Sequence, residues 1–294
     1  MGLGPGASCH CLVTFDPPGD APQFTNARTP SAALTPPHRS LDNGPMDPTS
    51  QFTESEQQPH RVDADGDAWF SALRVSYEQG NLDESDLAST PLTQFNEWLT
   101  QAIEAGLPEP NALTLATADE HGHPSSRTVL LKQADTRGFV MFSNYESRKG
   151  RDQVRNPWGA VAFLWLPLHR QVTARGPLLR VPREESAAYF ASRPRSSQLG
   201  AWASHQSQPL ASRSELEDRV AAAAERFPDS VPMPDYWGGF VLVPQVVEFW
   251  QGRPSRLHDR IRFVRTHHID ADADAPIPTG LDDATQWLTE RLSP

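Results

Sequence analysis

The feature that most constrains the fold is a series of short apolar segments joined by tight turns. ALTLATA (112–118) is followed by the turn DEHGH and by SSRTVLLK (125–132), and GFVMFS (138–143) begins at a turn glycine. GAVAFLWL (159–166) and RQVTARGPLLRV (170–181) form another such pair. Parallel strands need long crossover connections, so these turns predict antiparallel pairing. Further strands are predicted over 238–252, 255–265 and 285–291.

Helices are interleaved with these strands rather than alternating with them. They are predicted over 67–80, 90–106, 147–156, 182–193 and 212–227. The second helix is the best defined, because Thr90 can cap it, Pro91 suits its first turn and Gly106 suits its end. Its predicted apolar face consists of Phe95, Trp98, Leu99 and Ile103. The whole pattern predicts a mainly β (α+β) fold, an antiparallel barrel with helices packed outside.

The N-terminal part of the chain differs in composition from the rest. Residues 1–60 hold 10 of the 28 prolines and show no sustained periodicity, which predicts a disordered tail followed by one domain over 61–294. Met46 lies in this tail and is an alternative start site. The two cysteines, Cys9 and Cys11, lie there too, and no second pair of ligands follows at zinc-site spacing. A core without cysteine fits the cytoplasm, and neither a signal peptide nor a membrane-spanning run is recognised.

Charge narrows the class of partner. The formal net charge of −11 argues against nucleic acid as a partner. Many of the cations nevertheless fall between Arg127 and Arg265. A basic pocket on an acidic protein predicts a small anionic ligand.

Two basic clusters lie next to predicted strands. Arg127 and Lys132 stand at the two ends of RTVLLK, where they could equally mark the strand's exit from the core. Ser147, Arg148 and Lys149 open a helix directly after a strand. Helix N-termini bind phosphate and disfavour cations, so this placement favours a bound anion over a merely solvated surface.

A third cluster lies in YFASRPRSSQ. Tyr189 and Arg193 would share a helical face, and Ser197 would join them if a second helix begins directly after Pro194. Together they offer a guanidinium between two hydroxyls, which suits phosphate oxygens. A packed tyrosine and a surface arginine are an equally good interpretation of this stretch alone.

The fourth cluster is EFWQGRPSRLHDR, in which Arg256, His258 and Arg260 alternate after Trp250. In a strand, alternate side chains share a face, so the three cations would point the same way and Asp259 would point away. A bound anion would offset their repulsion, since charge-assisted hydrogen bonds contribute about 1.5–3 kcal/mol each.

The sequence contains no recognised motif for metal, serine-nucleophile or nucleotide chemistry. No H-E-x-x-H, no G-x-S-x-G, no strand-linked G-x-G-x-x-G and no P-loop occurs. The residues therefore predict a barrel with two or more phosphate-sized anion sites and aromatic walls. Two such sites suit a phosphorylated cofactor next to a phosphorylated substrate.

Eight motifs in a fixed order give a specific match. RTVLLK, SRKG, RQV, YFASRPRSSQLGAWASHQS, WGGF, EFWQG, RLHDR and ERLSP occur in that order between Asp67 and Pro294. Together they resemble the pyridoxine/pyridoxamine 5′-phosphate oxidase family. The resemblance implies an FMN-binding split β-barrel that forms a homodimer with FMN at the interface. It also implies pyridoxal 5′-phosphate synthase activity, in which pyridoxamine or pyridoxine 5′-phosphate is oxidised with O2 as acceptor and H2O2 as product.

The resemblance further implies roles for individual residues. Cofactor contacts would come from Arg127, Lys132, Phe142, Ser143, Arg148, Lys149, Gln171, Gln206, Ser207, Trp250 and Arg260. The substrate phosphate would be held by Lys132, Tyr189, Arg193 and Ser197. Arg256 and His258 would lie against the pyridine ring as the catalytic residues, and Arg74 and Tyr77 would cover the substrate. No metal is implied.

Two places depart from the family pattern. Phe142 and Ser143 stand where members often have Tyr-Thr, so one hydroxyl is missing. Val75 stands where members often have the second arginine of Arg-Arg-x-Tyr, which predicts a weaker N-terminal lid over the substrate.

Two alternative functions remain open from the sequence. One is another split-barrel flavin or deazaflavin reductase, which is not expected to keep both YFASRPRSSQ and RLHDR. The other is a non-catalytic carrier of pyridoxal phosphate, which would share the phosphate site with the oxidase. The sequence does not decide between amine and alcohol substrates.

Overall fold

The computed structural model describes residues 13–14, 77, 80–271 and 275–294. The predicted helix over 67–80 lies outside this range except for Tyr77 and Gly80. The predicted disordered tail also lies outside it, except for the short strand at Val13–Thr14.

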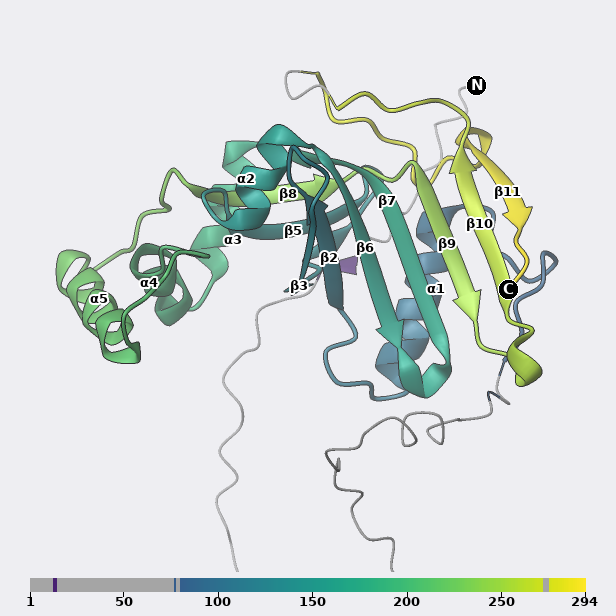
Figure 1. The fold of residues 1–294 in the computed structure, drawn as a ribbon, viewed down its shortest axis with the longest axis horizontal. Helices are drawn as coiled ribbons and strands as arrows, with labels where there is room; N and C mark the ends of the chain where they lie inside the picture. The colour runs from purple at the N-terminus through teal and green to yellow at the C-terminus, as the bar shows by residue number, and fades with distance from the viewer. Residues whose placement is uncertain (1–12, 15–76, 78–79, 272–274) are drawn as a thin grey trace, which may run out of the picture. The chain divides into compact units, whose positions relative to one another are not determined.

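The strands form a curled sheet in which the described residues pair antiparallel throughout, as predicted (Figure 1). They are β1 (Val13–Thr14), β2 (Ala112–Ala118), β3 (Pro124–Leu130), β4 (Gln133–Ala134), β5 (Phe139–Asn144), β6 (Trp158–Trp165), β7 (Arg170–Arg180), β8 (Trp237–Leu242), β9 (Val246–Gln251), β10 (Asp259–Arg265) and β11 (Trp287–Arg291). Their order is β1-β4-β5-β8-β7-β6-β2-β3, and β9, β10 and β11 extend from β7. The long strand β7 joins the two parts, because its first half pairs with β9 and its last residues pair with β8.

Two predicted strands are shorter in the structure. The segment 238–252 is divided into β8 and β9 around Pro244, which has no N–H to donate to a ladder. The segment 255–265 becomes a strand only at Asp259, because Pro254 opens the short 3-10 helix η3 (Pro254–Arg256). Ser255 and Arg256 there have φ angles of 58° and 62°, which no strand contains. The predicted strand through Arg256 and His258 is therefore wrong.

The helices lie where local signals predict them. They are α1 (Pro91–Glu104), α2 (Arg148–Arg155), α3 (Arg183–Ser192), α4 (Arg195–Ala203) and α5 (Arg213–Arg226). Thr90 caps α1 by accepting a hydrogen bond from the Thr93 N–H at 3.2 Å, and Gly106 follows the helix with φ of 68°. Ile103 is 47% exposed and not on the buried face, because Ala102 continues the row formed by Phe95 and Leu99.

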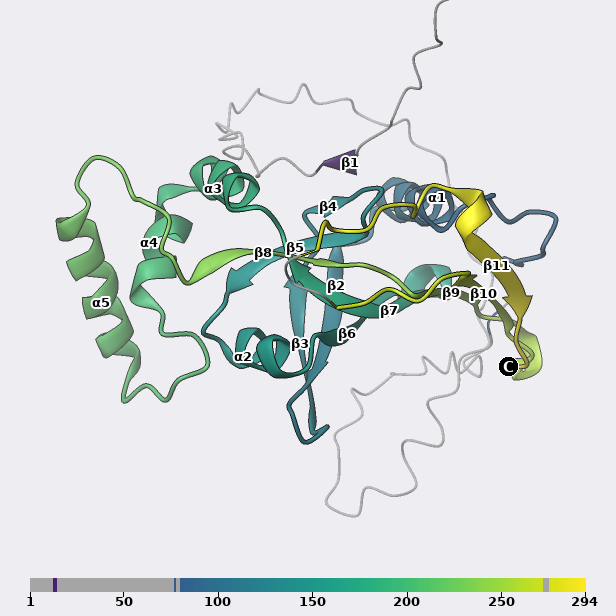
Figure 2. The same cartoon turned by 90° about the horizontal axis from the view of Figure 1, so that it is seen from above.

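The main core lies between α1 and the sheet. Phe95 packs against Phe139 and Phe163, with both pairs of ring centroids 4.9 Å apart. A smaller core of Phe190 and Trp237 with Leu199, Ala223 and Val231 joins α3, α4 and α5 to β8. Figures 1 and 2 show α3, α4 and α5 at one end of the sheet and β9, β10 and β11 at the other. Within the described residues, no helix combines the length and apolar character needed to cross a bilayer.

Candidate active site

A cationic cluster lies at the start of α2, directly after β5. Ser147 caps the helix and receives a hydrogen bond from the Lys149 ammonium at 3.1 Å. The same ammonium donates to Oε1 of Gln206 at 2.6 Å, and the Ser143 hydroxyl donates to that oxygen at 3.3 Å. Lys149 is only 9% exposed. The fold thus brings together four residues predicted from three separate motifs, Ser143, Arg148, Lys149 and Gln206.

The electrostatics of this cluster favour an anion. Burial, followed by the charge of Arg127, lowers the pKa of Lys149 to about 8. Burial also lowers the pKa of Arg127, and Arg148 adds to that effect while Asp152 opposes it. Both hydrogen-bond acceptors of Lys149 are neutral oxygens. A phosphate group would restore the charge balance and would also face the electropositive end of α2.

The orientation of Arg127 depends on residues that the sequence did not single out. Its guanidinium donates to the Leu115 carbonyl at 3.1 Å, to the Thr117 hydroxyl at 2.9 Å and to the Ser125 hydroxyl at 2.7 Å. Both hydroxyls donate in turn to Oδ2 of Asp152, at 2.7 and 3.2 Å. No motif links these residues, since only the β2–β3 register and the packing of α2 bring them together.

An aromatic shelf, formed by Phe142, Tyr189 and Trp237, carries the second set of predicted residues. Phe142 stacks on Tyr189 with ring centroids 4.1 Å apart and on Trp237 at 5.6 Å. The Arg193 guanidinium lies over the Trp237 ring at 4.7 Å, and the Lys132 ammonium lies 6.0 Å from the Tyr189 ring. Phe142, expected as a cofactor contact, therefore packs with predicted substrate residues, and Trp237 of the WGGF motif joins them.

The cations over this shelf also favour an anion. Nη1 of Arg193 is buried and has no hydrogen-bond partner among the described residues. Burial, followed by Arg193, lowers the pKa of Lys132, and burial lowers the pKa of Arg193 itself. A buried donor without an acceptor is costly, and together with the neighbouring Lys132 this donor is suited to a ligand oxygen. Ser197 lies in α4, which begins directly after Pro194 as the prediction required.

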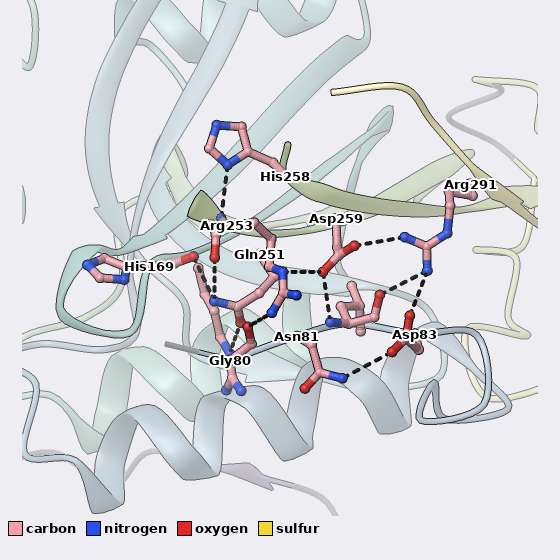
Figure 3. A network of polar contacts seen from close by, with 12 residues as sticks. Gly80, Asn81, Asp83, His169, Gln251, Arg253, His258, Asp259 and Arg291 are labelled. Carbon is pink, nitrogen blue, oxygen red and sulfur yellow. Dashed lines mark hydrogen bonds and ion pairs between the residues drawn. The ribbon is translucent and has the colours of Figure 1, made fainter. Parts of the chain in front are cut away.

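A third group, the ring cluster, lies at the turn between β9 and β10 and consists of Tyr77, His169, Trp250 and His258. Ring centroids are 4.4 Å apart for Tyr77 and His169, 4.6 Å for Trp250 and His258, and 5.8 Å for Tyr77 and His258. Nδ1 of His258 accepts a hydrogen bond from the Arg253 N–H at 3.1 Å (Figure 3). Burial, followed by Arg256, lowers the pKa of His258, which favours the neutral ring that this bond requires.

The charges around this turn differ from the sequence prediction. Arg260 is not free, because its Nε and Nη2 donate to the two oxygens of Glu248 at 2.7 and 3.2 Å. Asp259 does neutralise neighbouring cations, since it pairs with Arg291 at 2.9 Å and with Arg253 at 3.4 Å. Arg256 lies in η3 and is exposed. The alternating pattern therefore did not indicate three cations on one strand face.

The remaining predicted residues lie at the edges of these groups. Gln171 is opposite Trp250 in the β7–β9 register. Ser207 is exposed in the loop after α4, with φ of 69°. Arg74 lies outside the described residues. Among the described residues, no group of three or more His, Cys, Asp or Glu side chains is placed to hold a metal ion.

Within one chain, the ring cluster lies far from the aromatic shelf and the cationic cluster. Trp250 pairs with Gln171 near the start of β7, whereas Phe240, next to the shelf, pairs with Arg180 at its end. The nine residue steps from Gln171 to Arg180 span roughly 30 Å of strand. Both views agree, with α2 and α3 towards one end of the sheet and the β9–β10 turn at the other end (Figures 1 and 2).

Fold and site together define a class. A curled antiparallel sheet with flanking helices is the arrangement of a split-barrel protein, and here it carries two clusters of cationic side chains. The chain belongs to the pyridoxamine 5′-phosphate oxidase family. Residues 99–227 match the family model for pyridoxamine 5′-phosphate oxidase, and residues 237–294 match that of the pyridoxine 5′-phosphate oxidase C-terminal dimerisation region. The resemblance inferred from the eight motifs is thereby confirmed.

Individual relatives agree with this assignment. The pyridoxine/pyridoxamine 5′-phosphate oxidase of Paraburkholderia phytofirmans is 49% identical over 222 residues, 76% of this chain and 97% of that protein. The protein of the same name from Burkholderia ambifaria is 50% identical with the same coverage.

Solved structures confirm the split barrel with flanking helices. PhzG from Burkholderia lata 383, in complex with tetrahydrophenazine-1-carboxylic acid, has a TM-score of 0.63 at 28% identity and covers 74% of this chain and 100% of its own. A pyridoxamine 5′-phosphate oxidase-related, FMN-binding protein from Nostoc punctiforme has a TM-score of 0.51 at 16% identity. It covers 68% of this chain and 97% of its own, and it supports the fold alone.

Proposed function

We propose that the protein is an FMN-dependent oxidase that converts pyridoxamine and pyridoxine 5′-phosphate to pyridoxal 5′-phosphate. The observation that carries this proposal is the buried, unpartnered Nη1 of Arg193, beside Lys132 and above the aromatic shelf. A phosphorylated aromatic substrate supplies both the missing acceptor and a ring. The names of the curated relatives point to the same substrates.

The cationic cluster suits the phosphate of FMN. Lys149 and Arg127 lie close together, are partly buried, and donate hydrogen bonds to neutral oxygens. Two neighbouring cations without a carboxylate partner among the described residues need an anion. The residues that would hold the cofactor are Arg127, Lys132, Phe142, Ser143, Arg148, Lys149, Gln171, Gln206, Ser207, Trp250 and Arg260. Bound FMN would supply the two-electron redox chemistry and pass the electrons to O2. Arg260 reaches the cofactor only alongside its partner Glu248, so its contact adds little net charge.

The substrate site combines the shelf with the ring cluster. The substrate phosphate is bound by Lys132, Tyr189, Arg193 and Ser197. These contacts lie away from the reacting carbon, and their binding energy orients it. Arg256 and His258 lie against the pyridine ring and Tyr77 covers it, a role that the family resemblance also gives to Arg74, which lies outside the described residues. His258 enters this site as a neutral imidazole, because its Nδ1 accepts the Arg253 N–H and leaves Nε2 as the donor.

Two copies of the chain are needed to complete one site. A vitamin phosphate is far shorter than the roughly 30 Å of strand between the shelf and the ring cluster. The ring cluster, apart from Tyr77 and His169, lies in the segment that matches the family's dimerisation region. We therefore infer a homodimer in which the shelf and cationic cluster of one copy face the ring cluster of the other, with FMN between them.

The overall reaction balances without a further co-reactant. Pyridoxamine 5′-phosphate, O2 and water give pyridoxal 5′-phosphate, ammonia and H2O2, and the alcohol substrate with O2 gives the aldehyde and H2O2. Residues 61–294 form the catalytic domain in this proposal. Its lack of cysteine suits a cytoplasmic enzyme.

The test is to purify the protein, measure bound flavin by its absorbance, and add pyridoxamine 5′-phosphate in air. Stoichiometric aldehyde and H2O2, with little turnover of unphosphorylated pyridoxamine, are expected. Bound flavin without turnover would favour a different split-barrel enzyme, and the PhzG likeness makes tetrahydrophenazine-1-carboxylic acid the first alternative substrate to assay. Binding of pyridoxal phosphate without flavin would favour a carrier.

A further inference from the structure

A polar network, here called the clasp, joins the segment Gly80–Glu84 to the C-terminal strands (Figure 3). It consists of Arg253, Asp259 and Arg291. The Leu82 N–H donates to Oδ2 of Asp259 at 3.2 Å, and Nη2 of Arg291 donates to the Leu82 carbonyl at 3.0 Å. Nη1 of Arg253 donates to the Gly80 carbonyl at 2.5 Å. Side chains from the C-terminal part of the chain thus form hydrogen bonds with backbone N–H and C=O groups of this segment. The segment itself forms neither a strand nor a helix.

The clasp also binds the acidic side chains of this segment. Arg291 makes a two-pronged contact with Glu84, from Nε to Oε1 at 2.7 Å and from Nη2 to Oε2 at 2.6 Å. Nη2 of Arg291 also lies 3.4 Å from Asp83, and Asp259 is shared by Arg291 and Arg253. Two guanidiniums therefore face three carboxylates. Unlike the cations of the cationic cluster and those over the shelf, the two guanidiniums of the clasp are paired with carboxylates within the chain and do not need a bound anion.

The segment held by the clasp follows Tyr77 closely. Gly80 is three residues after Tyr77 in the chain, so their Cα atoms lie at most about 11 Å apart. The space around the Tyr77 ring is narrow, because a Cβ added at Gly252 would lie 3.0 Å from Cγ of Tyr77 and 3.0 Å from Cβ of His169. Gly80 has φ of 77°, and a Cβ there would lie 2.9 Å from the Gln251 side chain. Anchoring Gly80–Glu84 therefore restricts where the Tyr77 ring can lie.

We propose that Arg253, Asp259 and Arg291 are positioning residues, which fix Gly80–Glu84 and thereby hold Tyr77 as one wall of the ring cluster. The consequence for catalysis rests on the proposed function, in which that wall covers the substrate ring. Disrupting the clasp displaces Tyr77 from the ring cluster. The residues that bind the substrate phosphate and the FMN phosphate stay in place. The KM for pyridoxamine 5′-phosphate should then rise about 2- to 12-fold, the range of one aromatic contact, while FMN affinity stays unchanged.

The first arm of the test reads the position of Tyr77 without using activity. The chain has four tyrosines, so 3-fluorotyrosine labelling gives a simple ¹⁹F spectrum in which Tyr77→Phe identifies the Tyr77 signal. Arg291→Met should move that signal towards the value of free fluorotyrosine. Arg262→Met is the matched control, because Arg262 is similarly exposed in the neighbouring strand and pairs with Glu290 away from the clasp. Glu84→Gln gives a milder disruption should Arg291→Met fold poorly.

The second arm is a double-variant kinetic cycle. Arg291→Met and Tyr77→Leu should each raise KM, and the double variant should raise it no further than Tyr77→Leu alone. Arg291→Lys should raise KM less than Arg291→Met does, since a lysine keeps the positive charge but cannot make the two-pronged contact of a guanidinium. An unmoved Tyr77 signal in both Arg291→Met and Glu84→Gln, or additive KM effects, would overturn the proposal. Lack of any oxidase activity would instead overturn the proposed function, and the spectroscopic arm would still decide the role of the clasp.

Discussion

Lys149 should make the affinity of the cationic cluster for phosphate depend on pH. The residue is only 9% exposed, and burial, followed by Arg127, lowers its pKa to about 8. A bound phosphate favours the charged ammonium, so binding raises this pKa. Affinity should therefore be highest below pH 8, where Lys149 is already protonated, and should fall as the pH rises through that value.

The size of the effect follows from the titration of one group. Between pH 7 and pH 9, the protonated fraction of a lysine with a pKa near 8 falls from about nine tenths to about one tenth. With the bound lysine protonated throughout, the dissociation constant rises roughly tenfold, or about 1.4 kcal/mol. The second pKa of a phosphate monoester is about 6, so the charge of the ligand stays nearly constant in this window.

Calorimetric titration of the flavin-free protein with FMN measures both affinity and proton uptake. Repeating the titration in buffers of different ionisation enthalpy should show uptake of roughly half a proton per site at pH 8. Lys149→Arg is the control, because a guanidinium stays charged and should remove the pH dependence. The reasoning is refuted by a wild-type dissociation constant that stays constant from pH 7 to pH 9, or by the same slope in Lys149→Arg.

Three further substitutions test other parts of the structure. Arg193→Ala should raise the KM for pyridoxamine 5′-phosphate about 10- to 150-fold in steady-state kinetics, with FMN affinity nearly unchanged, and equal losses of both would contradict its assignment to the substrate phosphate. Gly239→Ala would place a Cβ 2.5 Å from Val181 and 2.8 Å from the Phe142 ring, so denaturant titration should show a free energy of unfolding about 1–3 kcal/mol lower. Phe95→Ala should lower it by about 3–5 kcal/mol, because Phe95 is 0% exposed at the centre of the core; a smaller loss would mean that the neighbouring rings collapse into the space.

Local signals were enough to predict much of the fold. The cap at Thr90, the start of a helix at Ser147 and the turn at Gly138 each depend on a few neighbouring residues, and the structure confirms them. The condition placed on Ser197, a second helix directly after Pro194, is met by α4. The cations at the start of α2 were also predictable, because their placement opposes the helix dipole.

Features that depend on distant pairings were not predictable. The pairing of Arg260 with Glu248 needs the β9–β10 register, and the stacking of Phe142 on Trp237 needs β5 beside β8. The alternation in RLHDR resembled a strand, but Pro254 and the positive φ of Arg256 place its first residues in a turn. His169, which contacts Tyr77, and Asp152, which orients the hydroxyls around Arg127, carry no motif at all.

The central claim is that one active site takes its shelf from one copy of the chain and its ring cluster from another. Mixed dimers of Arg193→Ala and Arg256→Ala, purified through two different affinity tags, test it most directly. In such a dimer both substitutions fall in one site and the other site is intact, so the account predicts about half of the wild-type oxidase activity per dimer. Activity no higher than that of the two parent variants would contradict it, because a site built within one chain cannot be restored by mixing.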